Sequence, residues 1–142
     1  MKFKQLNIEN ILAMMPLAQL LNPNLGEETL HQRQRDMFKH THYHCFGLYH
    51  NAELIALSSA WSTTRLYSGK QLELDNVVVL PKLRSKGIGN LFMQMIENWA
   101  LERGYQTIEL NSYVENTASH KFYNRRSYKI LGHHFQKRLT TE

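Results

Sequence analysis

The segment at residues 84–89, Arg-Ser-Lys-Gly-Ile-Gly, constrains the fold of this chain more than any other feature. It follows an extended apolar run at 72–80 and precedes an amphipathic segment at 88–103. This order predicts a strand, a short loop and a helix. Because its two glycines have no side chains to hold a ligand off the backbone, the first N–H groups of the helix can point at an anion. The arginine and lysine add positive charge, so a pyrophosphate would suit the loop.

Two common nucleotide-binding motifs do not match this loop. A P-loop requires Gly-x-x-x-x-Gly-Lys-Ser/Thr, and a dinucleotide fold requires Gly-x-Gly-x-x-Gly in an early βαβ unit with an acidic residue about twenty positions later. Neither pattern is present. The motif Arg-x-x-Gly-x-Gly, after Val-Val-Val-Leu-Pro at 77–81, instead resembles the acetyl-coenzyme-A loop of the GNAT superfamily of N-acetyltransferases.

A second stretch carries the same resemblance. Asn116-x-Ala118 followed by Phe122-Tyr123 is similar to the second signature of that superfamily. The matching region extends over about residues 72–139, roughly half of the chain. The resemblance implies an α/β (α+β) fold whose mixed central sheet is largely antiparallel, contains a parallel central pair and is flanked by helices.

Length and composition favour one compact domain over residues 1–142. A chain of 142 residues that is 42% hydrophobic can build one core but hardly two. No apolar stretch approaches the roughly 20 residues needed to span a bilayer. The polar-apolar alternation at 1–5 is typical of a strand rather than a signal peptide, so a cytoplasmic protein without a membrane partner is expected. The single Cys45 cannot form an internal disulfide and is expected to be a small buried side chain.

The formal net charge of +5 raises the question of a nucleic-acid partner. The basic residues are spread along the chain rather than gathered on one helix face, so no nucleic-acid partner is expected. Part of the charge is better explained by a polyanionic cosubstrate.

Hydrophobic patterning predicts the other elements. The helix expected after Asn10 directs Ile11, Met14, Met15, Ala18 and Leu21 inward, and a weakly amphipathic helix is expected at 27–39. Residues 45–49 and 54–61 predict a hairpin, 67–70 a turn, 107–111 a strand parallel to the one at 71–80, and 116–122 a capped helix. The helix at 88–103 presents Ile88, Leu91, Phe92, Met95, Ile96 and Trp99 to the core, and strands are expected at 128–130 and 135–139.

The strand at 71–80 has an irregular pattern. Leu72 and Leu74 share one parity, whereas Val77 and Val79 share the other. A regular strand cannot hold all four on one face, so we expect a β-bulge near Asp75-Asn76. The alternative is a strand buried on both faces.

The resemblance implies two catalytic side chains. Glu73 occupies the strand position of the general base in many GNAT enzymes, although it could instead be the outward polar residue of an alternating strand; Asp75 and Glu109 are the alternatives. Tyr123 follows the second signature, where a tyrosine hydroxyl lies beside the coenzyme sulfur and can protonate the thiolate, although it could instead serve in packing.

The resemblance also implies the residues that bind acetyl-CoA. The backbone of the valine run would pair with the pantetheine arm, and Asn116 would hydrogen-bond the same arm or cap its helix. The candidate cosubstrate-binding residues are Val77, Val78, Val79, Arg84, Ser85, Lys86, Gly87, Ile88, Gly89, Asn90 and Asn116. Ser127 stands where the family commonly has glycine, and Asn90 where a small residue is frequent.

No metal site is expected from the eight histidines, because no carboxylate or cysteine partner occurs at recognisable ligand spacing. His44 and His120 are instead candidates for the neighbourhood of the acceptor.

The function that the resemblance implies is transfer of acetyl from acetyl-CoA directly to a primary amine of a small molecule or protein. A homodimer is common in the family, and acceptor specificity is expected in the N-terminal helices and at residues 62–70. The alternatives are a noncatalytic CoA-binding regulator and a basic polyanion-binding module.

Overall fold

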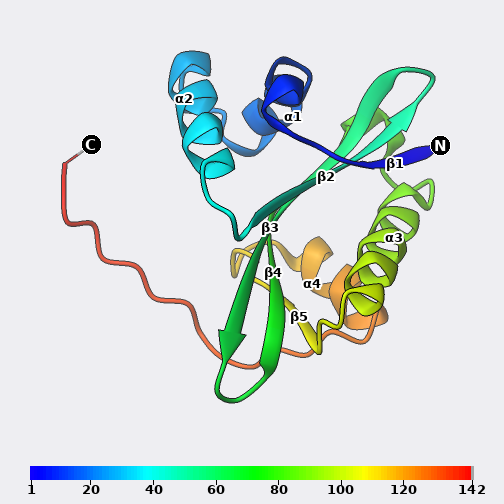
Figure 1. Cartoon of the computed structure of the whole chain (residues 1–142), viewed down its shortest axis with the longest axis vertical. Helices are drawn as coiled ribbons and strands as arrows, with labels where there is room; N and C mark the ends of the chain where they lie inside the picture. Colours follow the sequence, from blue (N-terminus) through cyan, green and yellow to red (C-terminus); the bar gives the residue numbers. More distant parts are fainter. Residues whose placement is uncertain (142) are drawn as a thin grey trace. The chain divides into compact units, whose positions relative to one another are not determined.

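The computed structural model describes residues 1–141, which form two compact units, Met1–Leu110 and a second unit from Asn111 onward. The first unit contains β1 (Lys2–Gln5), η1 (Ile8–Asn10), α1 (Ile11–Leu21), α2 (Glu27–Phe38), β2 (Tyr43–His50), β3 (Glu53–Arg65), β4 (Gly69–Val79), η2 (Pro81–Leu83), α3 (Ile88–Glu102) and β5 (Thr107–Leu110), where η denotes a short 3-10 helix. The second unit contains α4 (Thr117–Arg125) (Figure 1).

The sheet of the first unit has the strand order β1-β2-β3-β4-β5. Neighbours from β1 to β4 are antiparallel, whereas β4 and β5 are parallel, with Gln71–Leu74 paired to Thr107–Leu110. The predicted mixed α/β fold is therefore confirmed, as are the hairpin and the strand-helix-strand order. The parallel pair lies at one end of the described strand order rather than in its centre.

The predicted bulge in β4 is confirmed. The register with β3 pairs Asp75 with Ser59 and Val78 with Leu57, so β4 gains one residue over this interval. Asn76 adopts a left-handed conformation with φ 54°. The extra residue reverses the alternation, which explains why the apolar positions change parity along one strand.

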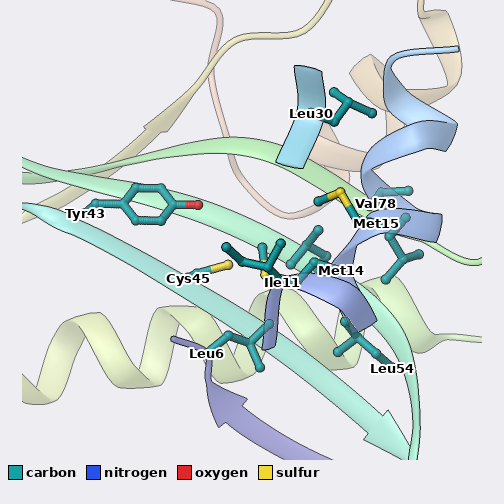
Figure 2. Close-up of a cluster of buried hydrophobic side chains, with 11 residues drawn as sticks. Leu6, Ile11, Met14, Met15, Leu30, Tyr43, Cys45, Leu54 and Val78 are labelled. Carbon is teal, nitrogen blue, oxygen red and sulfur yellow. The ribbon is translucent and has the colours of Figure 1, made fainter. Parts of the chain in front are cut away.

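One face of the sheet packs against α1 and α2. The cluster on this face joins Ile11, Met14 and Met15 of α1 and Leu30 of α2 to Tyr43, Cys45 and Val78 of the sheet (Figure 2). Its polar members are hydrogen-bonded: Gln34 Nε2 donates to the Tyr43 hydroxyl at 2.8 Å, and that hydroxyl also bonds the Ser59 hydroxyl. The cluster fixes which side chains of β2, β3 and β4 lie beneath the two helices.

The opposite face packs against α3. The Trp99 ring lies 4.7 Å from Phe46 of β2 and 5.1 Å from His44, measured between ring centroids. Phe92, Met93 and Ile96 of the same helix are buried. Figure 1 shows α3 running alongside the sheet, away from α1 and α2.

Two predicted core residues are exposed. Leu21, the last residue of α1, is 38% exposed. Leu17, one turn earlier in the same helix, is buried and was not among the predicted core residues. Leu91 is also 38% exposed, because the buried stripe of α3 runs through Met93 and Ala100. Both errors arise because three- and four-residue spacing defines a face only to within about a third of a turn.

The predicted strands at 128–130 and 135–139 are wrong. The described part of the chain has no regular secondary structure after Arg125, and the Ile130, Phe135 and Leu139 side chains are exposed. A strand needs a neighbour that accepts and donates its backbone hydrogen bonds, and alternation alone does not supply one. Among the described residues, no helix combines the length and apolarity needed to cross a membrane.

Candidate active site

The loop between β4 and α3 is held by its own backbone and by Arg84. Arg84 is extended, Ser85 has φ 63° and Gly87 has φ 79° at the residue before the helix. Arg84 Nε donates to the Val79 carbonyl at 3.3 Å. This bond fastens the loop to the end of β4, so Arg84 shapes the loop from within.

The N-terminus of α3 is open to a ligand. No side chain caps the helix, and the bond from Leu91 N to Gly87 O at 3.1 Å begins the backbone ladder. The N–H groups of Ile88, Gly89 and Asn90 therefore precede that ladder. A Cβ built on Gly87 would meet no atom within 4 Å, and the exposed Lys86 lies next to it in the chain. Open space, helix N–H groups and positive charge suit a pyrophosphate.

The second half of β4 has a strand neighbour on one side only within the first unit. Val78 and Val79 pair with β3, whereas the pairing with β5 ends at Leu74–Leu110. The backbone of Val77, Val78 and Val79 thus borders a strand edge to which an extended ligand can add by main-chain hydrogen bonds. The loop and this edge are consecutive in the chain.

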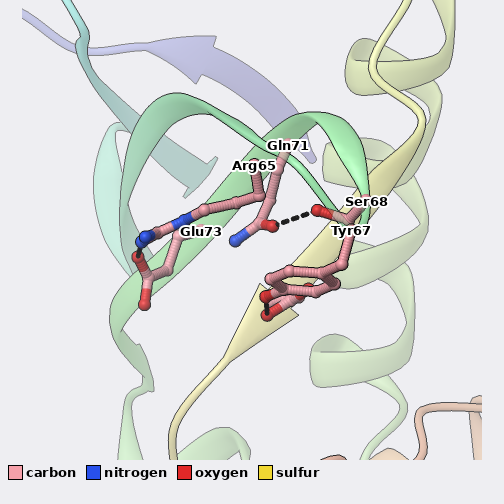
Figure 3. A network of polar contacts seen from close by, with 6 residues as sticks. Arg65, Tyr67, Ser68, Gln71 and Glu73 are labelled. Atoms are coloured by element: carbon pink, nitrogen blue, oxygen red, sulfur yellow. Dashed lines mark hydrogen bonds and ion pairs between the residues drawn. The ribbon is translucent and has the colours of Figure 1, made fainter.

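Glu73 lies on the α1/α2 face of the sheet. It pairs in register with Trp61, which pairs with Tyr43 of the buried cluster. The Glu73 side chain is 31% exposed, and its Oε2 lies 3.8 Å from Arg65 Nη2 (Figure 3). A half-buried carboxylate that solvent can reach is suited to accept a proton.

Both alternatives to Glu73 lie on the same face. Glu109 is the register partner of Glu73 on β5, and both of its carboxylate oxygens accept from the Tyr67 hydroxyl, at 2.8 and 2.9 Å. Asp75 is two residues further along β4, where partial burial of its carboxyl group raises the pKa above its ordinary value. The structure therefore brings three carboxylates to one region of one face.

The second unit contains the other two candidates. Asn116 caps α4, since its Oδ1 accepts from Ser119 N at 3.1 Å. Tyr123 is half-buried, with its ring 5.1 Å from Phe122 and 5.6 Å from Tyr128 between centroids. Burial raises the pKa of Tyr123 to about 12, so its hydroxyl stays protonated at neutral pH.

Comparison with known proteins identifies the family. The model described as "Acetyltransferase (GNAT) family" matches residues 12–128, well over half of the chain. The chain belongs to this family. Acetyl-CoA is the acyl donor of GNAT enzymes, and solved GNAT structures contain CoA.

Two curated relatives show the range of the family. The GNAT chain is 29% identical over 108 residues to an uncharacterized N-acetyltransferase, YhdJ, of Bacillus subtilis, covering 76% of each chain. It is 29% identical over 90 residues to the aminoalkylphosphonate N-acetyltransferase of Salmonella typhimurium, covering 63% of this chain and 58% of the relative. The match thus spans little more than half of the second relative.

Solved structures show the same fold at lower sequence identity. Aminoglycoside N-acetyltransferase AAC(6')-Iy in complex with CoA superposes with a TM-score of 0.84 at 17% identity, covering 96% of this chain and 93% of the other. Ribosomal-protein-alanine N-acetyltransferase from Brucella melitensis gives 0.81 at 15% identity, with coverage of 98% and 100%. These likenesses concern the fold alone.

The structure also shows where the cysteine and two of the histidines of this GNAT chain lie. Cys45 is fully buried, and burial raises the pKa of its thiol to about 12, so it is a protonated core side chain. The His44 ring packs on Trp99, which places it on the α3 face, opposite Glu73. His120 lies in the second unit, where its Nε2 is 3.0 Å from the Tyr113 carbonyl oxygen. Among residues 1–141, no group of three potential metal ligands is found.

Sequence reasoning did not identify three side chains that surround the carboxylates. Trp61, Arg65 and Tyr67 come from the end of β3 and the following turn, yet they lie next to Glu73 and Glu109. The sequence predicted that the segment at 62–70 contributes to acceptor specificity, but it assigned no role to any single residue there. The register of the hairpin at 65–69 would have been the signal, because it places Trp61 opposite Glu73.

Proposed function

We propose that this chain transfers an acetyl group from acetyl-CoA directly to a primary amine of a small molecule or a protein. The observation that carries the proposal is the uncapped N-terminus of α3, which follows a basic, left-handed loop at the end of β4. Its N–H groups and charge suit the pyrophosphate of the donor. Membership of the GNAT family supplies the reaction class.

The donor would be held by consecutive parts of the chain. Lys86 and the N–H groups at 87–90 would bind the pyrophosphate, while Arg84 keeps the loop against β4. The backbone of Val77, Val78 and Val79 would pair with the pantetheine amides, and one of these N–H groups would polarise the acetyl carbonyl. Bound acetyl-CoA supplies the reactive thioester. Asn116 would contribute a further hydrogen bond to the pantetheine arm.

Glu73 would act as the general base. An ammonium ion has no lone pair, so the acceptor must lose a proton before it attacks a carbonyl carbon. The Glu73 carboxylate is open to solvent on the α1/α2 face and can take this proton directly or through water. The buried, protonated Cys45 does not provide an activated nucleophile, which favours direct attack over an acetyl-enzyme.

Tyr123 would act as the general acid. With a pKa of about 12 its hydroxyl is protonated at neutral pH, and it would donate first a hydrogen bond and then the proton to the sulfur as the thiolate leaves. Phe122 and Tyr128 pack against the ring and fix its orientation in the second unit. The same residue can stabilise the thiolate by a hydrogen bond before the proton moves.

Two measurements test the proposal. Calorimetric titration with acetyl-CoA should show saturable binding, and thiol release in the presence of an amine panel should show turnover. The panel includes an aminoalkylphosphonate, the substrate class in the name of the Salmonella relative. Glu73→Gln and Tyr123→Phe should each lower kcat by about 10²- to 10⁴-fold, the usual contribution of a positioned acid or base.

Matched controls are available on the surface. Glu53→Gln removes a glutamate that pairs with Lys82, and Tyr113→Phe changes a tyrosine that is 84% exposed. Neither control should alter turnover. Saturable binding without acetylation of any amine would indicate a noncatalytic CoA-binding protein, and absence of binding would refute the donor assignment.

A further inference from the structure

Helix α2 is held to the sheet by few buried side chains. Within Glu27–Phe38 only Leu30 and Gln34 are buried, and Met37 and Phe38 are partly buried at the end of the helix. The neighbouring helix α1 buries four apolar side chains. Apolar contact is not directional, so the apolar residues of α2 alone would let this helix shift on the sheet. The placement of α2 therefore depends on Gln34.

Gln34 begins a chain of hydrogen bonds that runs from α2 to β2 and β3. Its Nε2 donates to the Tyr43 hydroxyl at 2.8 Å, so that hydroxyl can donate its own proton to Ser59 Oγ. Gln34 and Tyr43 are each 7% exposed, and Ser59 is 1% exposed. Figure 2 shows the Tyr43 hydroxyl directed into the buried cluster. A hydrogen bond requires a particular distance and angle, so this chain fixes the helix in a way that apolar packing does not.

The ring of Tyr43 connects this chain to the candidate general base. Its centroid lies 4.8 Å from that of Trp61 and 5.2 Å from that of Phe38, the last residue of α2. His40, just beyond the helix, lies 5.6 Å from the Trp61 ring between centroids. Tyr43 pairs in register with Trp61, and Trp61 pairs with Glu73. The indole beside Glu73 is therefore packed against rings from the end of α2 and from β2.

Stability alone does not account for a polar chain at this place. The surrounding cluster is apolar and includes Ile11, Leu30 and Val78. Leaving one partner of a buried hydrogen bond unpaired is costly, whereas replacing all partners by apolar groups of similar shape is nearly neutral. What the polar chain adds to an apolar core is a single, directed arrangement of the elements that it joins.

This inference rests on the proposed function. We propose that Tyr43 is a positioning residue for the acceptor: through its bonds to Gln34 and Ser59 it holds α2 and the indole of Trp61 in one arrangement beside Glu73. Tyr43 is too buried to touch the acceptor, so it acts through the half-buried Trp61. The donor loop follows β4, and none of these contacts reaches it, so binding of acetyl-CoA should not depend on the Tyr43 hydroxyl.

The variant Tyr43→Phe removes the hydroxyl and keeps the ring. We expect KM for the amine to rise by about three- to tenfold, the scale of one hydrogen bond, in the thiol-release assay. The amine probes are aminopropylphosphonate, butylamine and lysine. Because Glu73 keeps its contact with Arg65, kcat should change little, and Kd for acetyl-CoA should be unchanged by calorimetry. Partial unfolding would instead lower the apparent kcat at constant KM, since it only removes active enzyme.

Two further variants separate positioning from stability. The triple variant Gln34→Leu, Tyr43→Phe, Ser59→Ala removes every polar partner of the chain, so its Tm should recover relative to Tyr43→Phe. Its KM for the amine should stay raised, because apolar packing does not restore the directed bond. The control Tyr49→Phe makes the same change on the same strand, where the ring packs against the same cluster. It should leave KM at the wild-type value.

Hydrogen exchange reports the placement of α2 without any amine. In Tyr43→Phe, the backbone amides of Glu27–Phe38 should exchange faster than in the wild type, while those of Ile11–Leu21 keep their protection. Mass spectrometry of peptides from the two helices would measure the difference.

The outcomes separate the two proposals. A wild-type KM in Tyr43→Phe, or unchanged exchange in α2, would overturn this inference and leave the acetyltransferase assignment intact. A triple variant that regains both Tm and KM would also overturn it, because the chain would then serve stability alone. Absence of acetyl-CoA binding, or of thiol release with every amine, would refute the proposed function and this inference with it.

Discussion

At the scale of single residues, His44 shows how the fold can set the charge of a side chain. Its Nδ1 accepts from Gln5 Nε2 at 3.2 Å, and its ring packs 5.1 Å from Trp99 between centroids. Burial lowers the pKa of His44 below its ordinary value of 6.5, and the nearby charges of Arg103, His42 and Lys70 act in the same direction. The folded protein therefore prefers the neutral imidazole.

This preference predicts a pH dependence of stability. The folded pKa lies below the unfolded one, so the contribution of His44 is complete above about pH 6.5 and is lost as the pH falls through this value towards the folded pKa. We expect His44→Gln to reduce the loss of Tm between about pH 7.5 and about pH 5.5 by a few degrees, measured by thermal unfolding. The exposed His50→Gln is the control. An unchanged pH dependence in His44→Gln would contradict the prediction.

At the scale of elements, α4 departs from the family at its C-terminus. Ser127 has φ 70°, and Tyr128 N bonds the Tyr123 carbonyl at 2.9 Å, which closes the end of the helix. This conformation suits glycine, the residue that the family commonly has there. The serine therefore keeps the geometry of the helix end at a cost in backbone strain.

We expect Ser127→Gly to stabilise the second unit by roughly 1 kcal/mol, because left-handed backbone costs a non-glycine residue about 1–2 kcal/mol and the added freedom of the unfolded chain offsets part of the gain. Chemical denaturation followed by tyrosine fluorescence would measure it. Asn116→Ala, at the other end of α4, should have the opposite sign, with a loss of about 1 kcal/mol of capping. Destabilisation by Ser127→Gly would show that the serine has a further role.

The elements of the first unit could largely be predicted from sequence, because each carries a local signal. Parity along β4 revealed the bulge, and glycine followed by an amphipathic stripe marked the start of α3. The C-terminal strands failed because alternation is local whereas strand pairing is not. Leu21 and Leu91 failed because the packing of neighbouring elements decides which edge of a helical stripe is covered.

The candidate site could also be predicted only where its residues are close together in the sequence. The donor loop is contiguous, so its residues could be named from the chain alone. The surroundings of Glu73 come from three strands and a turn, and their proximity depends on register, which no short motif encodes. Tyr67 and Trp61 were therefore found only through the structure.

At the scale of the whole molecule, binding of the donor should change thermal stability. A ligand that binds only the folded state stabilises it by about 2.7 kcal/mol at a concentration 100 times Kd, which corresponds to roughly 5–10 °C for a chain of this length. We expect acetyl-CoA to raise Tm by this amount in a thermal-shift assay. In Gly89→Glu the shift should disappear, because a carboxylate would occupy the N-terminus of α3. An equal shift in this variant would place the donor elsewhere.

The bulge at Asn76 has a consequence for how the chain tolerates alteration. Asn76 is the extra residue of β4, and the bulge that accommodates it keeps Val78 on the same face as Asp75. Exchanging its side chain leaves that assignment in place. Deleting it would remove the bulge and leave Val78 opposite Leu57, so the inward face of β4 would survive the loss of this residue, whereas a regular strand that kept it would turn Val78 to the α3 face.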